Sequence, residues 1–353
     1  MKTKMSEQIL REPVRNFKDQ MRRNQLEWRH HNLANQDSGE QNGGSYEHVL
    51  PAKLWEFNLW SGIKSQSKHS LPDYLEENRI RKHTGCHNLL SSWVMCANLY
   101  FPFRCESGYE ILSGFLRKFI SPNIKSVRCV ELEYELEDAT LQPDALLGEM
   151  DGGRGAGQTS PDVAFLVETQ DGLGIILVEC KFTEHNFYPC SGRKPNPRNG
   201  DPNRDRTRCL NAKAVLDDPH KQCHLSEWNR KYWDYLKPVA NTQVMSQLKA
   251  CPAAFGGYQL FRQQSLAEAI AQSGKFALVI STVAYDERNT GLMGSLNRST
   301  GITDIRSEWG GLFPGKAGFS TFTHQAWVDW VREHDQQEQW KEWLEYITER
   351  YGM

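Results

Sequence analysis

Two short motifs in the middle of the chain combine carboxylates with a lysine. The first is Pro161-Asp162, and the second, after sixteen intervening residues, is Glu179-Cys180-Lys181. Neighbouring carboxylates repel each other unless a divalent cation lies between them. Mg²⁺ (or Mn²⁺) suits such oxygen ligands and keeps waters for a substrate phosphate, and a lysine can hold or polarise the attacking water. Residues of these types predict metal-assisted hydrolysis of a phosphodiester bond.

The elements expected around the motifs bring these side chains together. The pattern predicts a strand over 162–168, a turn over 169–174 and a strand over 175–182. Glu179 and Lys181 are two residues apart on the second strand, so they share one face of the sheet. A hairpin places the aspartate of the first motif at the same end. The apolar run of the second strand predicts an interior strand that is buried on both faces.

Further elements flank this hairpin. Apolar spacing predicts a helix over 106–120, and strict alternation predicts a strand over 126–137. A Gly-rich connection over 138–160 leads to the first motif, and a polar insertion follows the second motif. After the insertion, the pattern predicts a helix over 258–273 and a strand over 276–285. The order is therefore helix, three strands, insertion, helix and strand.

The two motifs in this order of elements resemble the PD-(D/E)xK nuclease superfamily. The chain also resembles, more closely, a bacterial group of restriction endonucleases with a long Cys-containing insertion and an aromatic C-terminal helix. The resemblance implies an α/β fold of the restriction-endonuclease type, with a mixed central sheet flanked by helices, a loop-rich Cys-containing insertion and helical N- and C-terminal extensions. The expected division is an N-terminal extension over 1–85 and a nuclease-like domain over 86–353, with a core at about 105–285, the insertion at 184–240 and a C-terminal helical segment at 325–351.

The same resemblance implies roles for individual residues. Asp162 and Glu179 would bind Mg²⁺ (or Mn²⁺), the main-chain carbonyl of Cys180 would be a further ligand, and Lys181 would assist the nucleophile. The Cys180 side chain alternates away from its neighbours and is expected in the core. Three additional candidates lie on the flanking helices: Glu110, Gln259 and Gln263. A solvated helix face explains Glu110 equally well, and plain surface positions are an even alternative for the two glutamines.

The insertion contains cysteines in a segment that is too polar to build a core of its own. Cys190, Cys209 and Cys223, with His224, are ligand types for Zn²⁺ or an iron–sulfur cluster. The chain has no CxxC pair, and a fourth ligand is not evident. Ordinary reduced cysteines are the slightly favoured alternative. The odd total of nine cysteines also favours reduced thiols over a disulfide framework.

Charge is distributed unevenly along the chain. The net charge is −2, from 42 basic and 44 acidic residues, which excludes a histone-like protein coated with cations. The insertion is locally basic, and such a segment can follow phosphates, although a solvated loop is an equal alternative. Its candidate nucleic-acid-binding residues are Arg193, Lys194, Arg198, Arg204, Arg206 and Arg208.

These observations favour a Mg²⁺-dependent DNA endonuclease, and the resemblance adds a prokaryotic restriction or defence role. The alternatives are an RNA- or end-specific nuclease that uses the same site, and an inactive nucleic-acid-binding module. The chain shows no apolar run of membrane-spanning length and no apolar signal core at its start, so we expect a cytoplasmic protein without a membrane partner. Cutting two strands often needs two sites, which makes a homodimer plausible.

Overall fold

A five-stranded mixed sheet forms the centre of the protein. The computed structural model describes residues 16–195, 197 and 201–353, and in these residues the strands lie in the order β3-β4-β5-β6-β7. The strands are β3 (Ile124–Leu132), β4 (Val163–Thr169), β5 (Leu173–Lys181), β6 (Leu278–Tyr285) and β7 (Gly318–Thr323). The pairs β3–β4 and β4–β5 are antiparallel, whereas β5–β6 and β6–β7 are parallel. The expected mixed sheet is confirmed, and β5 is its central strand.

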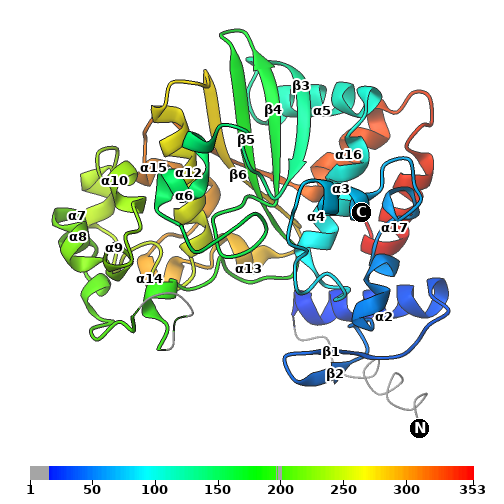
Figure 1. The fold of residues 1–353 in the computed structure, drawn as a ribbon, viewed down its shortest axis with the longest axis horizontal. Coiled ribbons are helices and arrows are strands. Elements are labelled where there is room, and N and C mark those ends of the chain that lie inside the picture. The colour runs from blue at the N-terminus through cyan, green and yellow to red at the C-terminus, as the bar shows by residue number, and fades with distance from the viewer. Residues whose placement is uncertain (1–15, 196, 198–200) are drawn as a thin grey trace.

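Helices cover both faces of this sheet (Figure 1). One face packs against α4 (Ser92–Tyr100), α5 (Glu106–Phe119), α16 (His324–His334) and α17 (Lys341–Tyr351). The other face packs against α12 (Tyr258–Gln272) and α15 (Ile305–Leu312). The alternation of β5 separates the two cores, because Ile176 and Val178 enter the first core while Ile175 and Leu177 enter the second.

The expected elements around the motifs are present, but the first strand is shorter. The helices predicted over 106–120 and 258–273 are α5 and α12, and both motif strands form. The strand predicted over 126–137 ends at Leu132, because Glu133 has a left-handed backbone with φ of 49°. Arg154, from the Gly-rich connection, donates to the main-chain oxygens of Leu132 and Glu133 where the strand ends.

The C-terminal part contains features that the pattern did not predict. Strand β7 forms the edge of the sheet next to β6. The segment predicted as helical over 325–351 is two helices, α16 and α17. Between them, the Asp335 carboxylate accepts hydrogen bonds from the main-chain amides of Gln339 and Trp340 and caps the turn.

The insertion is more ordered than its composition suggested. Val215, Leu225 and Trp233 are buried in the second core, and the rings of Trp233 and Phe261 on α12 lie 5.0 Å apart. The insertion therefore packs on the body of the protein instead of building a separate core. Its short helices are α7 (Ala212–Asp217), α8 (Pro219–Gln222), α9 (His224–Glu227) and α10 (Tyr232–Leu236), followed by α11 (Thr242–Ser246).

The described part of the N-terminal extension packs on the same body. Helix α2 (Phe17–Asn32) lies against α17, where the side-chain amide of Gln25 donates to the Arg350 carbonyl at 2.8 Å. The hairpin of β1 (Gly39–Gln41) and β2 (Gly44–Tyr46) follows at the same end of the molecule (Figure 1). The other α-helices of the described residues are α3 (Leu71–Glu77), α6 (Pro143–Leu147), α13 (Thr290–Met293) and α14 (Asn297–Thr300). The division of the chain at residue 85 stays a prediction.

Candidate active site

The sheet register places the two acidic motif residues opposite each other. The antiparallel pairing of β4 and β5 ends at Val163 and Val178, so Asp162 and Glu179 are the next opposed positions. Lys181, two residues further along β5, shares the face of Glu179. Its Nζ lies 2.7 Å from Glu179 Oε1. The hairpin expected from the sequence therefore gathers the three side chains at one end of the sheet.

Main-chain and helix contacts fix the carboxylates in place. Asp162 Oδ2 accepts a hydrogen bond of 2.7 Å from the main-chain amide of Cys180. Gln259, in the first turn of α12, donates its Nε2 to Glu179 Oε1 at 2.6 Å. The Cys180 side chain is buried in the opposite core, as expected from the alternation. Glu179 thus receives hydrogen bonds from both Lys181 and Gln259.

Burial and crowding of charge dominate the electrostatics of this site. Burial and the nearby charge of Glu179 raise the pKa of the Asp162 carboxyl well above its ordinary value. Burial alone would lower the pKa of Lys181, but the carboxylates of Glu179, Glu184 and Asp162 outweigh it and raise that pKa. The carboxylates around Lys181 therefore favour its charged ammonium form.

Sequence reasoning missed Glu133, an additional acid beside the motif residues. It follows β3 directly, is buried, and its main-chain amide donates to the Asp162 carbonyl at 3.1 Å. Burial and the charge of Glu179 raise its pKa to about 8. Its left-handed backbone is uncommon for a residue with a side chain, and such strain gathers at functional sites. No local pattern distinguished Glu133 from the other glutamates of that segment.

The donor set at the site suits a hard divalent cation. Two carboxylates from adjacent strands, crowded enough to raise the Asp162 pKa, are oxygen ligands whose repulsion such an ion would relieve. Among the described residues, no three His, Cys, Asp or Glu side chains are grouped as metal ligands. The predicted set requires two such side chains, Asp162 and Glu179, with the Cys180 carbonyl as the third protein ligand. Metal binding there stays a prediction.

The site opens into a cleft of about 370 Å³ whose walls come from distant parts of the chain. The motif residues and Gln259 form one wall. Residues of the N-terminal extension form the other, among them Lys18 and Arg22 of α2 and His83. The extension therefore contributes directly to the surroundings of the site, which its polar sequence did not indicate.

The two candidate glutamines of α12 have different surroundings. Gln259 reaches Glu179, as described above. Gln263 is buried, and its Nε2 donates to the Leu177 carbonyl, the Ser281 hydroxyl and the Thr282 carbonyl at 3.0–3.3 Å. Gln263 therefore ties α12 to β5 and β6, away from the carboxylates.

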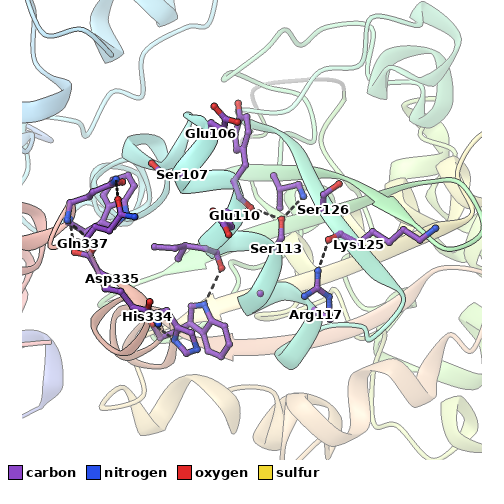
Figure 2. Close-up of a pocket in the computed structure, with 18 residues that line it drawn as sticks. Glu106, Ser107, Glu110, Ser113, Arg117, Lys125, Ser126, His334, Asp335 and Gln337 are labelled. Carbon is purple, nitrogen blue, oxygen red and sulfur yellow. Dashed lines mark hydrogen bonds between the residues drawn. The ribbon is translucent and has the colours of Figure 1, made fainter.

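Glu110 lies in a different hollow from the motif residues. It is exposed on α5 and lines a pocket of about 940 Å³, the largest of the described pockets. Figure 2 shows Glu110 there beside Glu106 and Ser107, with His334 and Asp335 of the C-terminal part on the far side. The structure does not bring Glu110 together with Asp162.

The insertion cysteines meet around one small pocket. Cys190, Cys209 and Cys223 line it together with Cys251, which the sequence analysis had not linked to them. Burial raises the pKa of Cys223 to about 11, which keeps this thiol protonated. The nitrogens of the His224 ring already contact Arg208, Glu227 and the Asp201 carbonyl. No metal-ligand group is present in the described part of the chain; a metal held by these residues stays a prediction, and zinc and iron analysis of the purified protein tests it.

The basic residues of the insertion divide into engaged and exposed groups. Arg193 lies 4.5 Å from the Phe255 ring and donates to Cys209 Sγ, and Arg208 pairs with Glu227. Arg198 lies outside the described residues. The exposed members are Lys194, Arg204 and Arg206. Of these, Lys194 lines a hollow next to the cleft at the motif residues.

Comparison with known families identifies the chain. A family model described as Restriction Endonuclease associating with ARP matches residues 20–352. The chain belongs to this family. Membership indicates a nuclease that acts on nucleic acid, and the matched span includes both the insertion and most of the N-terminal extension. Searches of curated proteins and of solved structures found no match. Within the described residues, this family member has no helix that is long and apolar enough to cross a membrane.

Proposed function

We propose that the protein is a Mg²⁺-dependent endonuclease that hydrolyses DNA phosphodiester bonds in prokaryotic restriction or defence. The observation that carries this proposal is the opposed pair Asp162 and Glu179, with Lys181 Nζ 2.7 Å from Glu179, at the base of a cleft. Membership of a restriction endonuclease family supports the reaction class. The resemblance to the PD-(D/E)xK superfamily supports the individual roles.

Asp162 and Glu179 would hold the cation, with the Cys180 carbonyl as a further ligand. When bound, Mg²⁺ would offset the crowded carboxylates and the negative charge that develops on the phosphate. The amide of Cys180 fixes Asp162, and the contacts of Lys181 and Gln259 fix Glu179. The carboxylates are therefore oriented before substrate arrives, which reduces the cost of reorganisation.

Lys181 acts in this scheme as a cationic donor. Its raised pKa keeps the ammonium protonated at neutral pH, so it can orient an attacking water or a phosphate oxygen by donating a hydrogen bond. Gln259 complements it as an acceptor. Its Oε1 is buried and has no hydrogen-bond partner among the described residues, so it can accept from a water placed beside Glu179.

Cleavage assays with site variants test the proposal. Supercoiled plasmid, linear duplex and RNA are incubated with Mg²⁺, with Mn²⁺ and with a chelator. We expect metal-dependent nicking of the closed circle, and we expect Asp162→Asn, Glu179→Gln and Lys181→Met each to slow it by about 100-fold or more. Glu168→Gln is the matched control, because this carboxylate lies near the far end of β4 from Asp162 and pairs with Arg128 at the surface.

The outcomes separate the alternatives. Digestion of linear DNA alone, or of RNA alone, would replace the endonuclease assignment with an end-specific or RNA-specific nuclease. Binding without cleavage, unchanged in Lys181→Met, would indicate an inactive binding module. Cleavage at the normal rate by Asp162→Asn and Glu179→Gln would show that the site is elsewhere.

A further inference from the structure

A second hollow adjoins the active-site cleft. Its volume is about 480 Å³, and Tyr188 and Gln259 line both spaces. Gln259 also contacts Glu179, so the residues shared by the two spaces include one that touches the motif carboxylates. Tyr188 and Gln259 therefore stand at the boundary between the cleft and the second hollow.

The lining of the second hollow combines cations with aromatic rings. Arg81 and Lys194 are exposed there, and the Trp228 side chain also lines it. Proteins that bind single-stranded nucleic acid combine basic residues along the phosphate backbone with aromatic side chains on which bases stack. The cleft itself is lined by Lys18 and Arg22. Both spaces beside the carboxylates therefore contain basic residues.

Tyr188 stands at the junction of the two hollows with an exposed ring. Its side chain is 54% exposed, although it is a large apolar residue, and its ring centroid lies 5.7 Å from Lys181 Nζ. The ring is therefore next to the residue that faces the scissile phosphate in the proposed mechanism. Lys181 Nζ lies over one face of the ring, and the exposed part of the ring is open to a ligand.

The backbone of Tyr188 is strained and firmly held. The φ of Tyr188 is 58°, which is rare for a bulky residue, and the Pro189 that follows restricts the Tyr188 backbone further. The Tyr188 amide donates to Asn186 Oδ1 at 3.0 Å, and its carbonyl accepts from the Tyr258 amide at 3.1 Å. Strain of this kind persists where surrounding contacts enforce it, and it gathers at ligand-binding positions. Glycine would adopt the same conformation without strain.

We propose that the Tyr188 ring stacks on a base of the substrate strand next to the scissile phosphate. The strand consequently binds with that base out of a duplex stack, and the adjoining nucleotides follow Arg81 and Lys194 through the second hollow. This inference rests on the proposed function and specifies the form of its substrate. Tyr188 is a substrate-binding residue in this scheme, and the hydrolytic groups remain those of the two motifs.

Binding of labelled oligonucleotides tests the stacking. The probe is a fluorescein-labelled 15-nucleotide single-stranded DNA, measured by anisotropy in a chelator so that no cleavage occurs, with the matching duplex in parallel. Tyr188→Leu and Tyr188→Gly are expected to weaken single-strand binding by about 5- to 150-fold, the range for loss of one stacked base, while Tyr188→Phe keeps it within about 2-fold. Phe57→Leu is the control, because this exposed aromatic lies outside both hollows.

Folding and activity readouts keep the result interpretable. Tyr188→Gly is expected to melt at or above the wild-type temperature, since glycine relieves the strain, so weaker binding by this variant cannot be ascribed to unfolding. The inference would be overturned if Tyr188→Leu binds the single strand as tightly as the wild type. It would also be overturned if the protein binds the duplex tightly and Tyr188→Leu does not weaken that binding. If the wild type binds in a Tyr188-dependent manner but cleaves nothing with Mg²⁺, the proposed function fails and the stacking stands. If the wild type cleaves DNA with Mg²⁺ and the Tyr188 variants bind single strands as tightly as the wild type, the stacking fails and the proposed function stands.

Discussion

Replacing Glu133 by glutamine should change how the stability of the protein depends on pH. The Glu133 side chain is 6% exposed, and burial together with the charge of Glu179 raises its pKa from 4.5 to about 8. Between these two pH values the folded protein holds a proton that the unfolded chain has released. The contribution of Glu133 to the free energy of unfolding therefore falls as the pH rises through this interval, and this contribution is largest below pH 4.5, where both states are protonated.

The expected size of the effect follows from the same pKa. One proton difference between the two states corresponds to about 1.4 kcal/mol of stability for each pH unit. Glutamine keeps the shape and cannot ionise, so at pH 7 Glu133→Gln should be about 3 kcal/mol more stable than the wild type, whereas at pH 4 the two should differ little. Mg²⁺ bound by Asp162 and Glu179 would narrow the difference, because a cation favours the ionised form of Glu133.

Urea denaturation between pH 4 and pH 8.5, with and without Mg²⁺, measures this difference. Glu135→Gln serves as the control, because Glu135 lies two residues further along the chain and is only half-buried. Parallel stability curves for the wild type and Glu133→Gln over this range would refute the reasoning. They would show that Glu133 is ionised in the folded protein without cost, and that it does not share a crowded acidic site with Glu179.

Three further predictions concern residues around the site. Gln263→Leu should lower the free energy of unfolding by about 1 to 3 kcal/mol, since buried acceptors on β5 and β6 lose their donor. Gln259→Leu should instead leave the free energy of unfolding nearly unchanged and slow cleavage. Denaturation and cleavage rates are measured on both variants, and equal losses of stability and of rate in the two variants would contradict the prediction. Arg262→Leu should destabilise the protein by about 3 kcal/mol in thermal or urea unfolding, because Glu149 is fully buried and would lose its ionic partner; an unchanged midpoint would argue against that pair. Glu110→Gln should cleave at the wild-type rate, and a loss comparable to that of the motif variants would place it back in the catalytic site.

Much of the fold could be predicted because its signals are local. The helix α5, the hairpin of β4 and β5, and the helix α12 follow from apolar periodicity over short windows. Strand β7 was missed because its mixed Gly-Phe-Ser-Thr-Phe-Thr sequence is marked as a strand only by its parallel partner β6. The insertion was predicted to be too polar to build a core of its own, and its few apolar side chains do pack on the surface that α12 supplies.

The candidate site shows the same division between local and long-range information. The sequence by itself determined that Asp162, Glu179 and Lys181 meet, because strand alternation and hairpin pairing are set by neighbouring residues. It could not choose between Gln259 and Gln263, which share one helix face four residues apart. Only the tertiary structure decided this, since the docking of α12 on the sheet places its first turn at the carboxylates and its second turn over the middle of β5.

The tertiary structure alone also decided which other residues surround the carboxylates. Glu133 reaches the site through a left-handed turn at the end of β3, Tyr188 through contacts with the start of α12, and Lys18 through the packing of α2. These positions depend on contacts between segments that lie far apart in the chain, and such contacts leave no period or spacing in the sequence. The chemistry proposed for the site therefore comes from two motifs, whereas Glu133, the exposed Tyr188 ring and the wall formed by the N-terminal extension became visible only when the packed chain brought them together.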